Sequence, residues 1–110
     1  MKTVLLITAE ASHRMIYEPA LKKNFTVVCA ASPHGATKEV AAVIYDLPMR
    51  PASEDFRWLE EVGVPVVVLT PKGSLHLPKA PAQRILEYMV RAADILKALA
   101  ELGVCSGSAC

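Results

Sequence analysis

The sequence has few aromatic residues, no excess of charge of either sign and no long hydrophobic run. Only 6 of its 110 residues are Phe, Trp or Tyr, too few for a platform that stacks single-stranded nucleic acid. Lys and Arg total 12 against 11 Asp and Glu, so we expect no basic face of the kind that nucleic acids or anionic membranes attract. The apolar runs are also far shorter than the roughly 20 residues of a membrane-spanning helix. We therefore expect no nucleic-acid partner and no membrane partner.

Cysteine is scarce as well. The 3 cysteines are an odd number, which is not typical of the disulfide framework of a small secreted protein. The first apolar run is followed by Thr8-Ala9-Glu10 rather than by a signal-peptide cleavage site, which favours a cytoplasmic protein. Cys29 lies within an apolar run and is expected to be buried. Cys105 and Cys110 allow a disulfide or a soft-metal clip, so a redox-responsive module is one hypothesis.

Apolar residues make up 53% of the chain, enough for the core of a single domain. Continuous apolar runs predict four strands that are buried on both faces, at residues 3–8, 25–30, 41–45 and 64–69. Helical spacing of apolar residues predicts helices at 12–23, 36–40, 52–62 and 81–102. This alternation predicts a three-layer α/β domain over residues 1–103, a parallel sheet with helices on both faces, followed by a flexible tail at 104–110.

In a parallel sheet, functional groups gather at the carboxyl ends of the strands. The sequence has neither a GxGxxG nor a GxxxxGK[ST] motif, so no nucleotide cofactor is expected there. Glu10, Asp46 and Thr70 each follow a predicted strand, and Asp46 does so directly after a buried run. Each also has a structural interpretation: Asp46 as a cap of the next turn, Thr70 as a strand residue and Glu10 as an acid at a helix N-terminus.

Three segments of the sequence, VLLITAE at 4–10, AVIYDLPM at 42–49 and VPVVVLT at 64–70, resemble the receiver domain of bacterial two-component response regulators. The most specific part is Asp-Leu-Pro-Met after an apolar strand, and the resemblance spans nearly the whole chain. It implies a CheY-like, flavodoxin-like fold. It further implies that Asp46 is a phospho-accepting aspartate, that Thr70 contacts the phosphoryl group and that Lys79 pairs with it.

The chain departs from this family at the first strand end. Receivers carry an acidic pair there, which holds the Mg²⁺ ion needed for phosphoryl transfer, whereas this chain has Thr8 and Ala9. Glu10 is the acid that remains. With Asp46 as the only well-placed carboxylate, we expect Mg²⁺ to bind poorly and no metal site to form.

A second departure is length. Thr70 and Lys79 lie nine positions apart, too close for a strand-linking helix, so the fourth helix is expected to be shortened or missing. Residues 75–77 then form either an antiparallel edge strand or no strand. The apolar stripe of the last predicted helix, together with the bare surface left by the missing one, predicts a homodimer.

The three histidines, His13, His34 and His76, lack metal-ligand spacing and are expected at the surface. The resemblance and its departures together predict an atypical stand-alone receiver-like domain, a pseudo-receiver. It would act as a protein-interaction module in signal transduction without Mg²⁺-dependent phosphorylation and without enzymatic activity. The alternatives are a phospho-accepting receiver or small phosphoryl-transfer enzyme that uses Asp46 with Glu10, and a redox-responsive module that uses Cys105 and Cys110.

Overall fold

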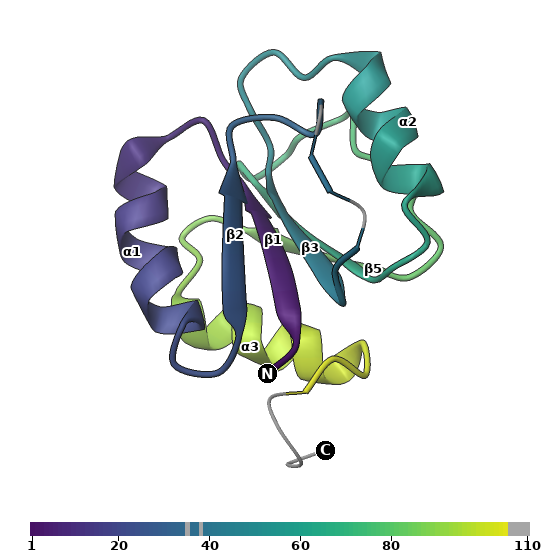
Figure 1. Cartoon of the computed structure of the whole chain (residues 1–110). Helices are drawn as coiled ribbons and strands as arrows, with labels where there is room; N and C mark the ends of the chain where they lie inside the picture. The colour runs from purple at the N-terminus through teal and green to yellow at the C-terminus, as the bar shows by residue number, and fades with distance from the viewer. Residues whose placement is uncertain (35, 38, 106–110) are drawn as a thin grey trace.

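The computed structural model describes residues 1–34, 36–37 and 39–105. Strands and helices alternate at the start of the chain and again at its end (Figure 1). The elements are β1 (Thr3–Ile7), α1 (Ala11–Leu21), β2 (Thr26–Ala30), β3 (Ala42–Asp46), α2 (Ser53–Glu61), β4 (Val66–Thr70), β5 (Gln83–Glu87) and α3 (Ala92–Glu101).

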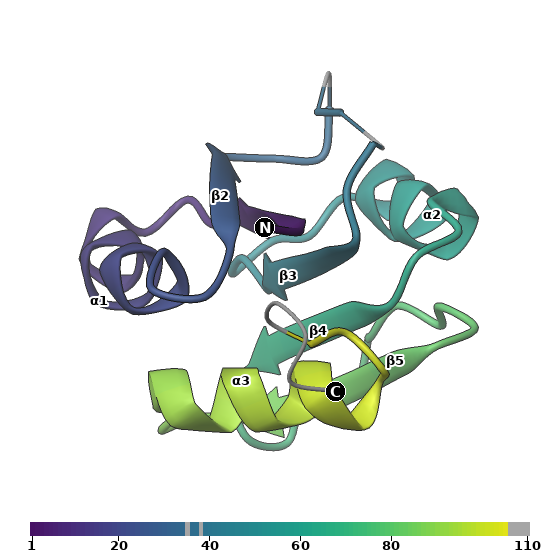
Figure 2. The same ribbon diagram turned by 60° about the horizontal axis from the view of Figure 1, so that its bottom comes forward.

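The five strands form one parallel sheet in the order β2-β1-β3-β4-β5. Helices α1 and α3 cover one face of this sheet and α2 covers the other (Figure 2). The predicted three-layer α/β architecture with a flavodoxin-like, CheY-like fold is therefore confirmed. None of the helices in the described part of the chain is long and apolar enough to cross a membrane.

The core has two parts because the central strands bury side chains on both faces. Strands β3 and β4 are buried along their whole length, whereas the edge strands β2 and β5 are only partly buried. In β1, Val4 and Leu6 pack toward α1 and α3, and Leu5 and Ile7 pack toward α2. This alternation explains why the inner strands appear in the sequence as continuous apolar runs.

The prediction of one long helix at 81–102 is wrong. This stretch contains β5, which pairs in parallel with β4, followed by the separate helix α3. The buried backbone of β4 needs hydrogen-bond partners along its outer edge, and β5 supplies them along the whole strand. This tertiary requirement outweighs the helical spacing of the apolar residues in the segment.

Two connections between parallel strands have no helix in their described residues. The described residues of the predicted helix at 36–40 are not helical, and no helix lies between β4 and β5 in residues 71–82. The predicted loss of the fourth helix is thus confirmed, whereas residues 75–77 form no strand. Because β5 begins at Gln83, the connection has the dozen residues that a parallel crossover needs.

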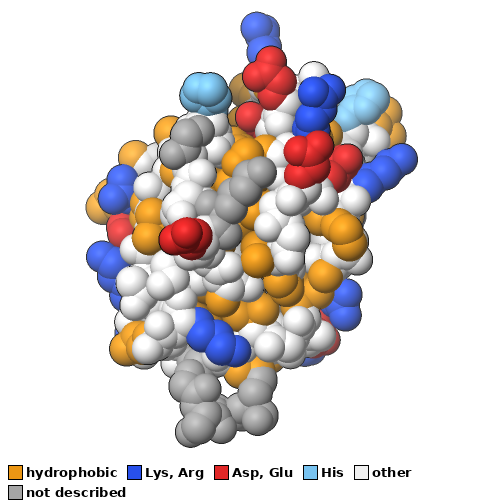
Figure 3. All heavy atoms as spheres, turned by 45° about the vertical axis from the view of Figure 1, so that its right-hand side comes forward, with side chains coloured by type: hydrophobic (Ala, Val, Ile, Leu, Met, Phe, Trp, Pro, Cys, Tyr) orange, Lys and Arg blue, Asp and Glu red, His pale blue; other side chains and the backbone are white. Residues whose placement is uncertain are grey.

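The face that carries α2 shows hydrophobic side chains between its charged groups (Figure 3).

Two residues of the predicted flexible tail belong to the packed domain. Val104 and Cys105 are buried, and the backbone N–H of Val104 donates to the carbonyl oxygen of Leu99 at 2.8 Å. Cys110 lies outside the described residues, so the redox hypothesis stays a prediction. Cys29 is a free, partly buried cysteine.

Candidate functional site

The candidate site lies at the carboxyl end of the sheet, around Asp46. Asp46 is the last residue of β3, a central strand, and its side chain is only 4% exposed. A buried carboxylate is costly unless hydrogen-bond donors or cations surround it. The groups that satisfy Asp46 therefore define the site.

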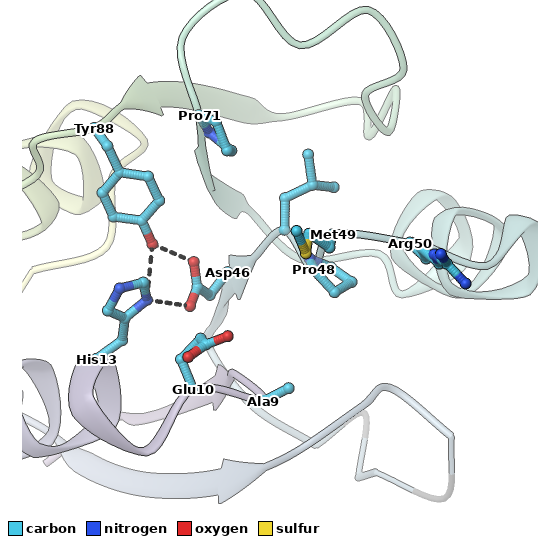
Figure 4. A pocket seen from close by; sticks show the side chains of 10 residues that line it. Ala9, Glu10, His13, Asp46, Pro48, Met49, Arg50, Pro71 and Tyr88 are labelled. Atoms are coloured by element: carbon cyan, nitrogen blue, oxygen red, sulfur yellow. Dashed lines mark hydrogen bonds and ion pairs between the residues drawn. The ribbon is translucent and has the colours of Figure 1, made fainter.

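Three side chains from other elements hold the carboxylate of Asp46, and Figure 4 draws two of them, His13 and Tyr88. The Thr8 hydroxyl, just after β1, donates to Oδ2 at 2.7 Å. His13, in the first turn of α1, brings its Nδ1 to 2.6 Å from the same oxygen. The Tyr88 hydroxyl, just after β5, donates to Oδ1. Both carboxylate oxygens are thus engaged by donors from three parts of the chain.

Tyr88 and His13 also contact one another. The Tyr88 hydroxyl oxygen lies 3.2 Å from His13 Nδ1, and the two rings are 5.2 Å apart. Burial, and next its hydrogen bond to Asp46, raise the pKa of Tyr88 well above the ordinary tyrosine value. Tyr88 therefore stays a neutral donor at physiological pH.

A pocket of about 640 Å³ opens beside this cluster. Its wall is largely apolar, with Leu47, Pro48 and Pro71 among the lining residues, and Arg50 contributes a cation. Glu10 also lines the pocket, where it is exposed. The pocket thus joins an apolar wall to the partly exposed His13 and Tyr88, a combination suited to a small ligand or to a side chain of a partner.

Glu10 contributes its backbone rather than its carboxylate to the cluster. Its N–H donates to the Thr8 hydroxyl oxygen at 3.0 Å. Thr8 accepts this bond while donating to Asp46, which fixes the direction of its hydroxyl. The structure therefore brings Glu10 and Asp46 to one pocket without bonding one carboxylate to the other.

Thr70 lies on the neighbouring strand end, but its hydroxyl is not bonded to Asp46. It is buried and donates to Ser74 Oγ at 2.7 Å, and the Ser74 hydroxyl in turn donates to the carbonyl oxygen of Pro71. Thr70 thus stabilises its own following turn in this structure.

Lys79, predicted from the resemblance to reach Asp46, lies at the opposite end of the sheet. It precedes β5 and is exposed, and its backbone N–H donates to Glu60 in the last turn of α2 at 3.3 Å. The expectation from the resemblance fails because Lys79 comes before β5, the last strand of the sheet, and not after it. With β5 in place, the residue that follows the last strand is Tyr88.

Sequence reasoning missed two members of the cluster, His13 and Tyr88. His34 and His76 are exposed as expected, but the side chain of His13 is only 32% exposed and bonded to Asp46. The available signal was position: a residue in the first turn of the helix after β1 stays near the carboxyl ends of the strands. Tyr88 carried no such signal while β5 was unrecognised.

These side chains do not fit a Mg²⁺ ion well. Mg²⁺ prefers several carboxylate and water oxygens in octahedral geometry. Glu10 and Asp46 are the only carboxylates among the lining residues, and Asp46 already accepts three hydrogen bonds. Within the described ranges, no group of three or more His, Cys, Asp or Glu side chains could hold a metal ion.

Comparisons with known proteins show which fold this is. No protein-family model matches the chain, and no curated protein matches it by sequence. Solved structures do. A response regulator receiver protein of Sinorhizobium medicae is 22% identical, with a TM-score of 0.71 over 92% of this chain and 93% of that one.

The chemotaxis protein CheY4 of Vibrio cholerae is 20% identical, with a TM-score of 0.70 over 93% of this chain and 98% of that one. The receiver domain of a sensor histidine kinase of Pseudomonas aeruginosa is 16% identical, with a TM-score of 0.72 over 93% and 98%. That domain is described with a magnesium ion coordinated in its active-site cleft. At these identities the likeness shows a CheY-like receiver fold.

Proposed function

We propose that this chain is a receiver-like protein-interaction module of signal transduction that works in the cytoplasm without Mg²⁺-dependent phosphorylation of Asp46. The fold supports the first part of this proposal, because the similar structures are receiver domains. The side chains around Asp46 support the second part, and the exposed apolar residues near the pocket support the interaction.

The observation that carries the proposal is that the Asp46 carboxylate is buried and hydrogen-bonded to three side chains. A carboxylate that attacks phosphorus needs an accessible oxygen and nearby positive charge that neutralises the incoming phosphoryl group. Here Oδ2 accepts from Thr8 and His13, and Oδ1 accepts from Tyr88. Both lone pairs of Oδ2 are engaged, and Oδ1 keeps only one, beside the Tyr88 hydroxyl. There is also no second well-placed carboxylate, among the residues that the structure describes, to bind the metal.

Exposed hydrophobic side chains support a partner at this end of the molecule. Met49 and Leu75 line a shallow hollow next to the pocket, and Met89 follows Tyr88. All three are almost fully exposed. Exposed apolar side chains beside a pocket, such as Met49 and Leu75, are typical of an interaction surface, and methionine adapts well to a partner.

The homodimer remains a proposal, with less apolar surface behind it than the sequence suggested. The apolar stripe predicted for the last helix includes Leu86 and Val90, but Leu86 belongs to β5 and packs against the core, and Val90 is buried. Light scattering at micromolar protein concentration tests it, since a monomer mass would reject the dimer.

The deciding experiment for Asp46 is exposure to an acyl phosphate donor in the presence of Mg²⁺, followed by intact-mass measurement. We expect no adduct on Asp46 in the wild type. A phosphoryl adduct that is labile to alkali and absent from Asp46→Asn would overturn the proposal. Detection of an adduct on a known phospho-accepting receiver, treated in parallel, verifies the reagent.

A phosphoryl adduct on Asp46 would favour the alternative, a phospho-accepting domain that uses Asp46 with Glu10. The observation behind this alternative is that both carboxylates line one pocket. If Glu10 helps to bind the metal, Glu10→Gln should lower the adduct yield without changing thermal stability. An unchanged yield would remove Glu10 from the reaction.

A further inference from the structure

The hydrogen bonds around Asp46 determine which nitrogen of His13 carries a proton. An ionised carboxylate only accepts, so His13 Nδ1, at 2.6 Å from Oδ2, must be the donor. The second neighbour of Nδ1, the Tyr88 hydroxyl, is consistent with a proton on Nδ1. The Tyr88 hydroxyl gives its own proton to Oδ1, so toward Nδ1 at 3.2 Å it offers only a lone pair.

With the proton on Nδ1, neutral His13 has its lone pair on Nε2. Within residues 1–34, 36–37 and 39–105, no side chain or backbone group hydrogen-bonds Nε2. His13 lines the pocket and its side chain is 32% exposed, against 4% for Asp46. Figure 4 shows Nδ1 facing Asp46 and the second ring nitrogen on the opposite side of the ring.

We propose that Nε2 of His13 is a nucleophilic site that accepts a phosphoryl group from a small, metal-free phosphoryl donor with a labile bond to phosphorus. This inference rests on the proposed function and deepens it. It gives the module a residue that accepts a phosphoryl group while Asp46 itself is not phosphorylated. Asp46 is a positioning residue in this scheme: it holds the imidazole ring in one tautomer and offsets the positive charge that forms on it.

The step balances with phosphoramidate as the donor. The Nε2 lone pair attacks phosphorus and forms an N–P bond. The donor reacts in its N-protonated form, so that when its P–N bond breaks the electron pair leaves with a nitrogen that already carries three protons, as neutral ammonia. The imidazole becomes a phosphorylated imidazolium that keeps its Nδ1 proton, and the Asp46 carboxylate stabilises the new positive charge.

The surroundings of His13 favour an anionic electrophile. His13 lies in the first turn of α1, whose N-cap residue makes no side-chain cap, so backbone N–H groups at this end have positive potential. Arg50 lines the same pocket, but Figure 4 shows it on the opposite side from His13, and it is exposed, so solvent screens its charge. Glu10 opposes this potential, but its side chain is exposed and therefore screened by solvent.

The test incubates the full chain with phosphoramidate and a metal chelator, then follows the adduct by intact mass and peptide mapping. We expect a phosphoryl group on His13 that survives alkali and is lost in acid, as N-phosphohistidine is. An acyl phosphate on Asp46 would instead be lost in alkali. The two proposals can therefore fail separately: an alkali-labile adduct on Asp46 in the experiment with Mg²⁺ counts against the proposed function, and a missing adduct on His13 in the experiment with the chelator counts against this one.

The other histidines provide matched controls, since His34 and His76 are exposed and free of this cluster. We expect His13 to react faster than either by about tenfold or more, and His34→Gln to leave its rate unchanged. His13→Gln should remove the fast phase. Equal rates at all three histidines in the wild type would overturn the proposal without reliance on any variant.

A spectroscopic measurement isolates the role of Asp46. Long-range ¹H–¹⁵N spectra of the wild type should show the His13 proton on Nδ1. In Asp46→Ala the proton should move to Nε2, as in free histidine, and phosphorylation should slow to the rate of His34. A purely structural role of Asp46 would leave the tautomer unchanged, and a wild-type proton on Nε2 would refute the assignment.

Discussion

Two neighbouring strand ends in this protein stabilise their polar residues in opposite ways. Asp46, at the end of β3, is held by His13, Thr8 and Tyr88. Their distances from it along the chain are 33, 38 and 42 positions. The side-chain hydroxyl of Thr70, at the end of β4, bonds to positions one and four residues further on, although its backbone carbonyl accepts from the N–H of Tyr88 at 3.0 Å. The first arrangement ties three elements together, whereas the second organises one turn. We therefore expect changes at Asp46 to affect the whole domain and changes at Thr70 to stay local.

The largest effect should follow Asp46→Ala. It leaves three donors without their acceptor inside or at the edge of the core, and we expect the free energy of unfolding to fall by about 3 kcal/mol. Chemical denaturation measures this change. Glu10→Ala is the matched control, because the Glu10 carboxylate is exposed, and it should shift stability by less than about 0.5 kcal/mol. A gain in stability for Asp46→Ala would mean that the three donors do not offset the burial of its charge.

Tyr88→Phe should rank second. The change keeps the ring and removes one hydrogen bond to a charged acceptor, which we expect to cost about 2 kcal/mol of unfolding free energy. Thermal and chemical denaturation check the value. Tyr17→Phe makes a useful comparison, since it removes a neutral hydrogen bond of 2.8 Å to the carbonyl oxygen of Val90 and should cost less. The reverse order would contradict the charged character of the Asp46 site.

The stability difference between the wild type and Tyr88→Phe should also depend on pH. The pKa of Tyr88 is raised in the folded protein, by burial first and by its hydrogen bond to Asp46 next. The unfolded chain therefore releases the tyrosine proton first as pH rises, and the contribution of Tyr88, fully present below about pH 10, declines above it. Each pH unit in that range should cost about 1.4 kcal/mol. Melting curves between pH 8 and 11 test this, and a constant difference would contradict it.

Thr70→Val should have the smallest effect. It preserves the shape of a buried side chain and removes a hydrogen bond to Ser74, a partly exposed residue of the adjacent turn. We expect a loss of about 1 kcal/mol or less, and no change in the His13 tautomer. Ser74→Ala removes the same bond from its other end and should give a similar value. A large loss, or a disturbed His13 spectrum, would show that the two strand ends are coupled.

The sequence allowed the central part of the fold to be predicted, because the inner strands are buried on both faces. The runs that became β1, β3 and β4 contain almost no polar residue, so the sheet and the place of Asp46 at its carboxyl end followed directly. The edge strand β5 is different. Its outer face meets solvent, its residues alternate irregularly in polarity, and helical spacing appeared to continue through it.

This difference decided which site residues could be found. Asp46 and Thr70 end strands that the apolar pattern marks clearly. His13 and Tyr88 reach Asp46 through the position of α1 and the pairing of β5 with β4. Lys79, which the resemblance implies near Asp46, lies before β5 and therefore at the other end of the sheet.

By itself, therefore, the amino-acid sequence determined a parallel α/β sheet, a shortened connection after β4 and a carboxylate at the end of a central strand. These features depend on local composition and on chain length. The closed hydrogen-bond cluster of Thr8, His13 and Tyr88 around Asp46 was decided by tertiary structure alone. Its members come from three separate segments, and only the order and register of the strands bring their side chains to one buried charge.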